Sequence, residues 1–388
     1  MILNAISNDI NVFLSKLPKI TDTLFSTASK RFLSHLIDHI HDADALLKKT
    51  KINVKNLGSK LPKGDSYKYI SLEIQKEIEN MEKNTYKTTF LIGDRKYKIY
   101  MVYNSLTKTE IQSRIKKIFL WLYLGTVFAR ETCSKETTIY LYFTDLVKVL
   151  PIQGKPISEI NANTAFTTSC KPSTEIYIYR EEEWFKVLIH ESFHNLGLDF
   201  SEINHNHSNK MIYDIFPVKS DVRLFETYCE TWAEIINVLF ISYFENLTRN
   251  KTIETAINMI QNERKFSLFQ CAKVLNFYGI DYQELHERRP ESAIKRNTRY
   301  KETTHVLSYY IIKSIFMFYT NSFIEWCIIN NNESLQFKIT DANITAYCGF
   351  LKLLYKKTEY TESIQSLEKW LNENTDYSNT LRMTVYEE

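Results

Sequence analysis

The spacing of apolar residues divides the chain into helical ends and a mixed centre. In residues 1–85, apolar side chains recur every three to four positions in ITDTLFSTASKRFLSHLIDHIHDADALL and again in SLEIQKEIENMEK. This spacing predicts amphipathic helices, separated by a break between residues 57 and 65 that contains two glycines. The same helical spacing dominates from residue 222 to the last lines of the sequence. The pattern therefore predicts a mainly helical protein.

Strand patterns are confined to the centre of the chain. TTFLIGDRKYKIYMVYN alternates on both sides of Gly93-Asp94, which predicts a β-hairpin. IQSRIKKIFLWLYLGTVFA predicts a buried helix, while TTIYLYFTDL and STEIYIYR predict strands. A helix is then expected over residues 181–196, because three glutamates suit its positive end and Gly197 suits its termination.

These elements together predict an α+β fold, mainly α, in four consecutive regions. We expect a helical N-terminal region over 1–85 and a hairpin with a helix and a strand over 86–150. The central core is expected over 151–330, followed by a helical region over 331–388. A chain of 388 residues exceeds the usual size of one domain, so appended segments around a core are expected.

Composition narrows the class of protein. The net charge is only +3 and the lysines are scattered, so we expect neither a nucleic-acid partner nor a membrane partner. There are eight glycines and neither a GxxxxGK[ST] nor a GxGxxG pattern, which argues against a phosphate-binding loop.

The cysteines and the N-terminus predict a location. The six cysteines are widely spaced without a CxxC pair, which favours free thiols in a reducing compartment. The first residues lack a basic stretch followed by an apolar one, and no run of 18 apolar residues occurs, so a cytoplasmic protein is expected.

The strongest chemical signal is His190-Glu191-Ser192-Phe193-His194, an HExxH pattern. Residues four apart lie on one face of a helix, so both imidazoles can bind the same ion, and we expect Zn²⁺. Glu191 follows the first ligand and can accept a proton from the metal-bound water. The alternative is an amphipathic helix with two partly buried histidines.

The third ligand decides the class of metal site. The sequence matches HExxHxxG as far as Gly197. In metal sites that extend this pattern to a third histidine, that histidine would fall at Phe200, which cannot bind a metal. Asp199, His205 and His207 are conceivable ligands, although the two histidines also suit a solvated turn. A stronger candidate is the segment FETYCETWAE, in which the three acids share one helical face; they are Glu226, Glu230 and Glu234. A bound cation would explain such neighbouring like charges, and a solvated acidic stripe is the alternative.

HExxH followed by a glutamate on a second helix resembles the gluzincin metallopeptidases. The resemblance implies Glu230 as third ligand and Glu234 as the acid that hydrogen-bonds a ligand histidine. In the other register Glu226 is the ligand and Glu230 stands behind it; the first register is favoured. The stretch from NANTAFTTSC to ETYCETWAEIIN is also similar to uncharacterised metallopeptidase-like proteins of large DNA viruses.

A donor for the developing oxyanion is expected downstream, in THVLSYYIIK. We predict Tyr309 or Tyr310 for this role, with Tyr228 and Tyr213 as alternatives. His35 and His39 also lie four apart, but no acid follows His35, so a solvated or partner-facing helix is expected there.

The sequence thus predicts a zinc metallopeptidase with a gluzincin-like core that acts on a peptide or protein substrate. Glu191 is expected to activate the water and pass its proton to the leaving amine. Two alternatives stay open. One is a catalytically inactive relative that serves as a structural or binding component, for example of a virion. The other is a processing protease specific for one protein.

Overall fold

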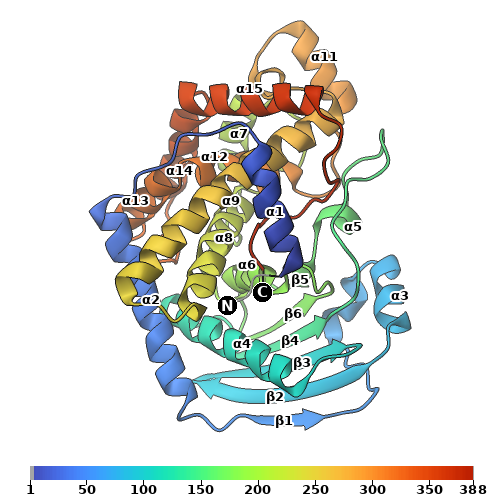
Figure 1. The fold of residues 1–388 in the computed structure, drawn as a ribbon, viewed down its shortest axis with the longest axis vertical. Coiled ribbons are helices and arrows are strands. Elements are labelled where there is room, and N and C mark those ends of the chain that lie inside the picture. Colours follow the sequence, from blue (N-terminus) through green and yellow to red (C-terminus); the bar gives the residue numbers. More distant parts are fainter. Residues whose placement is uncertain (1–3, 388) are drawn as a thin grey trace. The chain divides into compact units, whose positions relative to one another are not determined.

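The computed structural model describes residues 4–387 as an α+β fold, mainly helical, with one mixed six-stranded sheet (Figure 1). The chain separates into two units, each built from non-consecutive segments. Unit 1 comprises Met1–Phe32, Lys148–Ala162 and Ile203–Glu388, and unit 2 comprises Leu33–Val147 and Asn163–Glu202. Each unit draws on several of the four regions predicted from the sequence.

Unit 2 contains the whole sheet and the helix with the HExxH pattern. Its elements are most of α2 (Thr27–Leu47), β1 (Asn53–Asn56), η1 (Asp65–Tyr69), α3 (Leu72–Asn80), β2 (Asn84–Ile92), β3 (Arg95–Tyr103), α4 (Lys108–Phe128), β4 (Glu136–Tyr142), β5 (Ala165–Thr167), β6 (Ser173–Ile178) and α6 (Trp184–Asn195).

The strand order is β1-β2-β3-β4-β6-β5. The predicted hairpin is confirmed: β2 and β3 pair antiparallel, with Ile92 opposite Arg95 across the Gly93-Asp94 turn. β3, β4 and β6 are parallel, and β5 returns antiparallel to β6 at the edge. The short strands β1 and β5 were not predicted, because β1 is wholly exposed and β5 has only three residues.

The two faces of the sheet are covered differently. Helices α4 and α6 pack on the face that carries aliphatic residues such as Ile139 and Ile176. The opposite face carries a row of stacked tyrosine rings, with Tyr140 4.7 Å from Tyr177. The segment before α3 covers this row, and Tyr142 donates a hydrogen bond of 2.6 Å to the carbonyl of Pro62. The face under α4 and α6 is therefore buried, whereas the tyrosine face is covered only in part, since Leu91 of β2 and Lys96 of β3 are exposed.

One expectation about the cysteines is wrong. Cys133 and Cys170 form a disulfide, while Cys229, Cys271, Cys327 and Cys348 are free and buried. The disulfide joins the loops that lead into β4 and β6. Because these strands are parallel neighbours, with Glu136 opposite Ser173, their preceding loops lie side by side. This neighbourhood depends on the sheet order and could not be inferred from the wide spacing of the cysteines along the chain.

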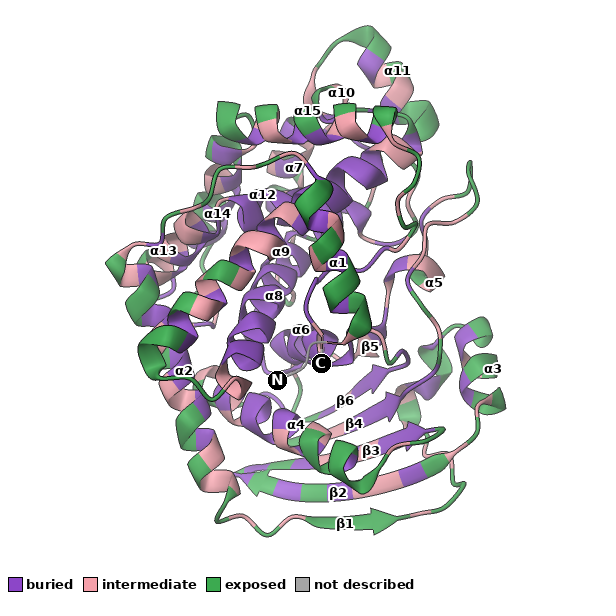
Figure 2. Ribbon diagram, in the orientation of Figure 1, coloured by how far each residue is buried: buried purple, intermediate pink, exposed green. Residues whose placement is uncertain are grey.

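Unit 1 is helical, as the apolar spacing predicted. Its helices are α1 (Ala5–Lys16), the first turn of α2, α5 (Glu159–Ala162), α7 (Asn206–Ile215), α8 (Leu224–Phe244), α9 (Arg249–Tyr278), α10 (Tyr282–His286), α11 (Pro290–Arg299), the π-helical turn η2 (Leu307–Ile312), α12 (Lys313–Phe318), α13 (Thr320–Asn330), α14 (Asp341–Leu354) and α15 (Thr358–Glu373). Helix α8 is buried along nearly its whole length (Figure 2).

The segment after α15 forms no helix, although a helical region was expected there, and its residues 381–386 are buried. Side chains of unit 1 bond its main chain directly: Glu263 accepts from the amides of Val385 and Tyr386, and Asn237 donates to the carbonyl of Tyr386. Lys313 also points at this segment, 3.4 Å from the carbonyl of Met383. These bonds replace those that a helix would have supplied, so residues 381–386 belong to the core of unit 1.

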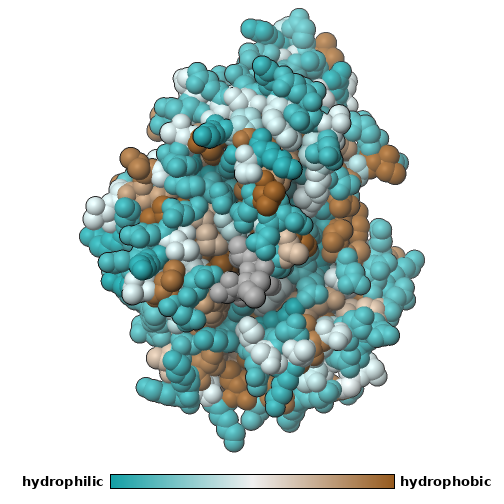
Figure 3. Space-filling view, in the orientation of Figure 1, coloured by the Kyte–Doolittle hydropathy of each residue, from teal (hydrophilic) through white to brown (hydrophobic). Residues whose placement is uncertain are grey.

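Within residues 4–387 no helix has both the length and the apolar character needed to cross a membrane. On the face drawn in Figure 3, hydrophilic residues predominate and hydrophobic residues occur in small separate groups.

Candidate metal centre

Helix α6 begins at Trp184, three residues later than predicted. The three preceding glutamates lie in a non-helical turn before α6 and are not part of its first helical turn. Glu181 forms an ion pair with Arg114, and Glu183 adopts a left-handed conformation with φ of 59°. The helix ends at Asn195, and Gly197 follows with φ of 69°, so the predicted glycine terminus is confirmed.

Packing within unit 2 fixes the position of α6. The ring of Phe193 stacks on Trp121 of α4 at 6.1 Å, and Ser134 donates a 2.6 Å hydrogen bond to the carbonyl of Asn195. At Gly197 a Cβ atom would lie 2.7 Å from the sulfur of Cys133, so a glycine is required there for space as well as for its φ. The last turn of the helix therefore sits directly against the disulfide loop.

The two histidines of the HExxH pattern meet on one face of α6, and both are buried. Their Nε2 atoms are 3.3 Å apart. Two nitrogens bound at ~2.0–2.1 Å to a tetrahedral ion lie about 3.4 Å apart, so this spacing fits two ligands of one zinc ion. It also fits a hydrogen bond between the two rings. The residues present can thus hold a metal ion without rearrangement of either ring.

Asp199 controls the orientation of His194. Its Oδ2 atom lies 2.6 Å from Nδ1 of His194, and its Oδ1 atom accepts a 3.0 Å hydrogen bond from Ser201. Arg130 donates to the main-chain carbonyl of Asp199 at 3.1 Å. A carboxylate at Nδ1 holds the proton on that nitrogen and directs the lone pair of Nε2 toward His190. Asp199 thus has the position of a residue that orients a ligand histidine.

Glu191 differs from the rest of its helix. It is the one residue of α6 that is not buried, although it lies between two buried positions. Glu191 is thus partly exposed to solvent next to the buried His190. This is the location that a residue exchanging protons with a bound water requires.

The three glutamates of the acidic segment lie on α8, in unit 1, and all three are buried. Glu234 is paired within its own unit: Lys313 donates to its Oε1 atom at 2.5 Å, and both side chains are at most 1% exposed. Burial raises the pKa of Glu234 well above its usual value, and the positive charge of Lys313 partly offsets this shift. Lys313 had no role in the sequence-based interpretation, because nothing in the pattern near residue 313 points to residue 234.

The predicted oxyanion donors lie in the π-helical turn η2. The hydroxyl of Tyr310 is buried and donates a 2.6 Å hydrogen bond to the carbonyl of Leu381. The ring of Tyr309 lies beside that of His305, with 6.0 Å between centroids. Of the alternatives, Tyr228 donates to Leu335 and Tyr213 donates to Ser220, both through main-chain carbonyls. Tyr310 therefore has a structural bond, and π-helical turns are frequent at functional sites.

The remaining histidine candidates have other neighbours. His205 packs on Phe225 with 5.0 Å between ring centroids, and Nε2 of His207 lies 3.4 Å from the hydroxyl of Thr345. In α2, His35 is exposed and His39 packs edge-on against Phe128. His35 is therefore exposed, as expected, whereas His39 is only partly exposed because it packs against Phe128.

A comparison with known proteins finds one distant viral relative. The chain is 25% identical over 118 residues to an uncharacterised protein of Acanthamoeba polyphaga mimivirus, and the aligned part covers 30% of each chain. The chain thus spans less than a third of the length of that relative. No protein-family model and no solved structure matches the chain. The viral relationship expected from the sequence is supported at this level.

Proposed function

We propose that the protein is a zinc-dependent hydrolase of peptide bonds with a gluzincin-like site. The observation that carries the proposal is the histidine pair of α6, with Nε2 atoms 3.3 Å apart and Asp199 at Nδ1 of His194. His190 and His194 would hold a zinc ion, which would supply an activated water and Lewis acidity toward a substrate carbonyl.

The third ligand is proposed to be a carboxylate of α8. The pairing of Glu234 with Lys313 within unit 1 leaves the register with Glu226 as ligand and Glu230 four residues behind it as the preferred one. Glu226 lies in the first turn of α8, where the positive end of the helix dipole stabilises a carboxylate. This position favours Glu226 as the ligand. Glu230 as ligand is the other register, and mutation distinguishes the two.

Glu191 supplies the acid–base chemistry in this proposal. Its carboxylate accepts a proton from the attacking water and later delivers it to the leaving amine, so that both proton transfers use one residue. Tyr309 or Tyr310 is proposed as the donor to the developing oxyanion. The hydroxyl of Tyr310 also donates to the carbonyl of Leu381.

A peptide substrate is favoured by the strand next to α6. β5 is the last strand of the sheet order, pairs on one side with β6, and packs against α6. An extended peptide can add to such an edge through main-chain hydrogen bonds. A substrate held there would lie along a strand that packs against the histidine helix.

Metal analysis and turnover of matched variants test the proposal. Purified protein supplied with zinc should bind one ion per chain, and His190→Ala or His194→Ala should abolish stoichiometric binding. Glu191→Gln should keep the zinc and lose turnover by on the order of 10²–10⁴-fold. A chain that binds no zinc contradicts the proposal. Zinc binding without hydrolysis of any peptide or protein would instead favour the structural or binding role.

The same assay separates the two registers of the third ligand. If Glu226 is the ligand, Glu226→Gln should lose far more zinc affinity than Glu230→Gln. Glu234→Gln is a control, because its effect should fall on stability through Lys313. Equal zinc affinity in all three variants would place the third ligand elsewhere.

A further inference from the structure

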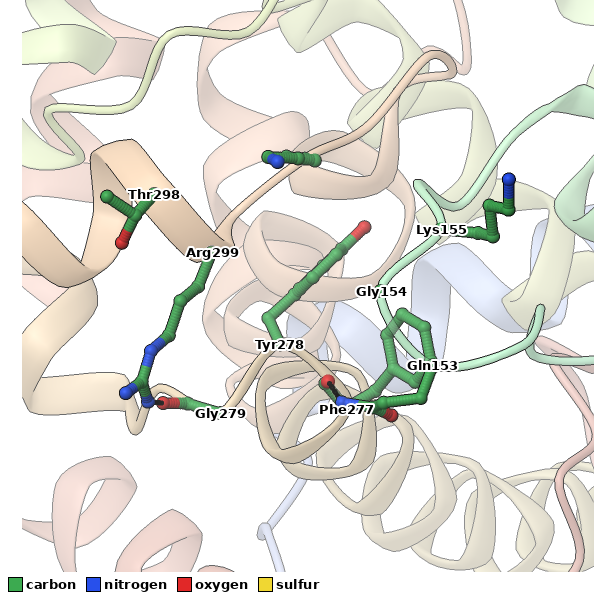
Figure 4. Close-up of a pocket in the computed structure, with 9 residues that line it drawn as sticks. Gln153, Gly154, Lys155, Phe277, Tyr278, Gly279, Thr298 and Arg299 are labelled. Carbon is green, nitrogen blue, oxygen red and sulfur yellow. Dashed lines mark hydrogen bonds between the residues drawn. The ribbon is translucent and has the colours of Figure 1, made fainter.

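A second candidate site lies at the C-terminal end of α9, entirely within unit 1. A pocket of about 320 Å³ opens there between the loop around Gly154, the end of α9 and the end of α11. Three cationic side chains line it: Lys155 from the loop around Gly154, and Arg299 and Lys301 from the end of α11 and the residues just after it. In the view of Figure 4, Lys155 and Arg299 lie on opposite sides of the Tyr278 side chain.

Hydrogen bonds hold the walls of this basic pocket in place. Arg299 donates from Nη1 to the carbonyl of Gly279 at 2.7 Å, and Gln153 donates to the carbonyl of Phe277 at 2.9 Å. Gly279 has φ of 65°, and a Cβ atom there would lie 3.1 Å from Nη1 of Arg299. A glycine thus allows the guanidinium to approach the end of the helix. The ring of Tyr278 is fixed by Tyr300, with 4.8 Å between centroids.

The three positive charges of the pocket are only partly neutralised by nearby carboxylates and helix dipoles. None of its nine lining residues is acidic, and Lys155 and Lys301 have no ion pair with any carboxylate in residues 4–387. The C-terminal ends of α9 and α11 each contribute about −0.5 charge through the helix dipole. Two such ends offset about one of three positive charges, which leaves about +2 at neutral pH.

Glu302, an acid that interacts with Tyr278 of the pocket, does not remove this excess of positive charge. Glu302 acts on Tyr278 through its charge but does not line the pocket. Its carboxylate accepts hydrogen bonds from the hydroxyl of Tyr300 and the amide of Leu307. Its burial raises its pKa to about 7, so at neutral pH it carries only part of a charge.

From this charge balance and the shape of the pocket we infer a binding site for a small organic phosphate monoester. A phosphate monoester carries about −1.5 to −2 charge at pH 7, which matches the excess. The basic side chains supply N–H donors for its oxygens, and Phe277 and Tyr278 offer an aromatic wall for the organic part. The volume lies at the lower end of the range for small-molecule sites.

Calorimetric titration of the full chain tests this site without any assay of hydrolysis. The probes are AMP, inorganic phosphate and adenosine at low salt. AMP should bind one to one, inorganic phosphate should compete with it, and adenosine should bind at least tenfold more weakly. Raising the salt concentration should weaken AMP binding, since the attraction is electrostatic.

The matched variants use exposed lysines, so that folding is preserved. Lys155→Ala with Lys301→Ala should weaken AMP binding by at least tenfold. Lys251→Ala with Lys352→Ala removes the same charge from other exposed positions of unit 1 and should leave the affinity within twofold. Three results would overturn the inference: no binding of AMP or phosphate up to 10 mM, equal binding of AMP and adenosine, or equal losses in the two double variants.

Discussion

The histidine pair of α6 and the carboxylate of Glu234 on α8 are both buried, but they differ in the groups that they contact. Glu234 meets the positive charge of Lys313 at 2.5 Å inside its own unit. The histidines instead face each other, with nitrogen atoms 3.3 Å apart, and Asp199 holds one of them in that orientation. Opposite charges in contact complete a structural pair, whereas two imidazole nitrogens 3.3 Å apart have the spacing of two ligands of one cation as well as that of a hydrogen bond.

The comparison makes Lys313 the residue whose loss should cost most stability. Lys313→Met leaves the carboxylate of Glu234 buried without its cation, which should lower the free energy of unfolding by about 3–5 kcal/mol. The double variant Glu234→Leu with Lys313→Met removes both charges and should recover most of the loss. Urea unfolding followed by tryptophan fluorescence measures both. A cost below about 1 kcal/mol for the single variant would mean that the pair is not self-contained.

The disulfide gives a similar test in unit 2. Cys133→Ser with Cys170→Ser opens a loop with a sequence separation of 37, and should lower the free energy of unfolding by about 2–4 kcal/mol. The sulfur of Cys133 lies against Gly197, so zinc affinity should fall as well. Reductant should reproduce the loss in the parent protein but not in the double variant. Cys348→Ser, at a buried free thiol of unit 1, is the control. The disulfide would be refuted if all six thiols of the parent protein could be alkylated under oxidising conditions.

These two residue pairs also show where prediction from the sequence stops. The β2–β3 hairpin and the approach of His190 to His194 were predicted because both follow from local geometry, a two-residue turn and one helical turn. The Cys133–Cys170 and Glu234–Lys313 pairs join positions far apart in the sequence. They depend on which strands and helices become neighbours, and no local pattern carries that information.

Asp199 is an intermediate case. The sequence raised it as a conceivable ligand, because it lies one residue before the position of a third histidine. Its orienting role depends on the turn at Gly197, which brings its carboxylate back to Nδ1 of His194. The glycine was visible in the sequence, but the direction of the returning side chain was not.

Glu263 is another buried carboxyl of unit 1, and its titration should make the stability of the fold depend on pH. Burial raises the pKa of this carboxyl from 4.5 to about 7. A raised pKa in the folded state means that the group stabilises the fold fully below about pH 4.5, and that this contribution is lost as the pH rises through about 7. The loss is at most about 3–4 kcal/mol, at 1.36 kcal/mol for each pKa unit between 4.5 and about 7.

Glu263→Gln should therefore show a smaller decline in stability between pH 4.5 and pH 7.5 than the parent protein. Urea unfolding at a series of pH values measures the difference. Glu254→Gln, at an exposed position of the same helix, should keep the decline of the parent. If Glu263→Gln and Glu254→Gln have the same pH profile, Glu263 is not the titrating group.

The smallest expected effect concerns Asp199, and it tests the histidine side of the comparison most directly. Asp199→Asn keeps the shape of the side chain but removes the negative charge that holds the proton on Nδ1 of His194. Zinc affinity, measured by competition with a chromophoric chelator, should fall by about 10–100-fold. Ser201→Ala removes only the 3.0 Å hydrogen bond to the other carboxylate oxygen and should have a smaller effect. Near-UV circular dichroism should stay unchanged in both variants. Unchanged zinc affinity in Asp199→Asn would mean that the pair is oriented by packing alone, and that the charge of Asp199 has no part in forming the site.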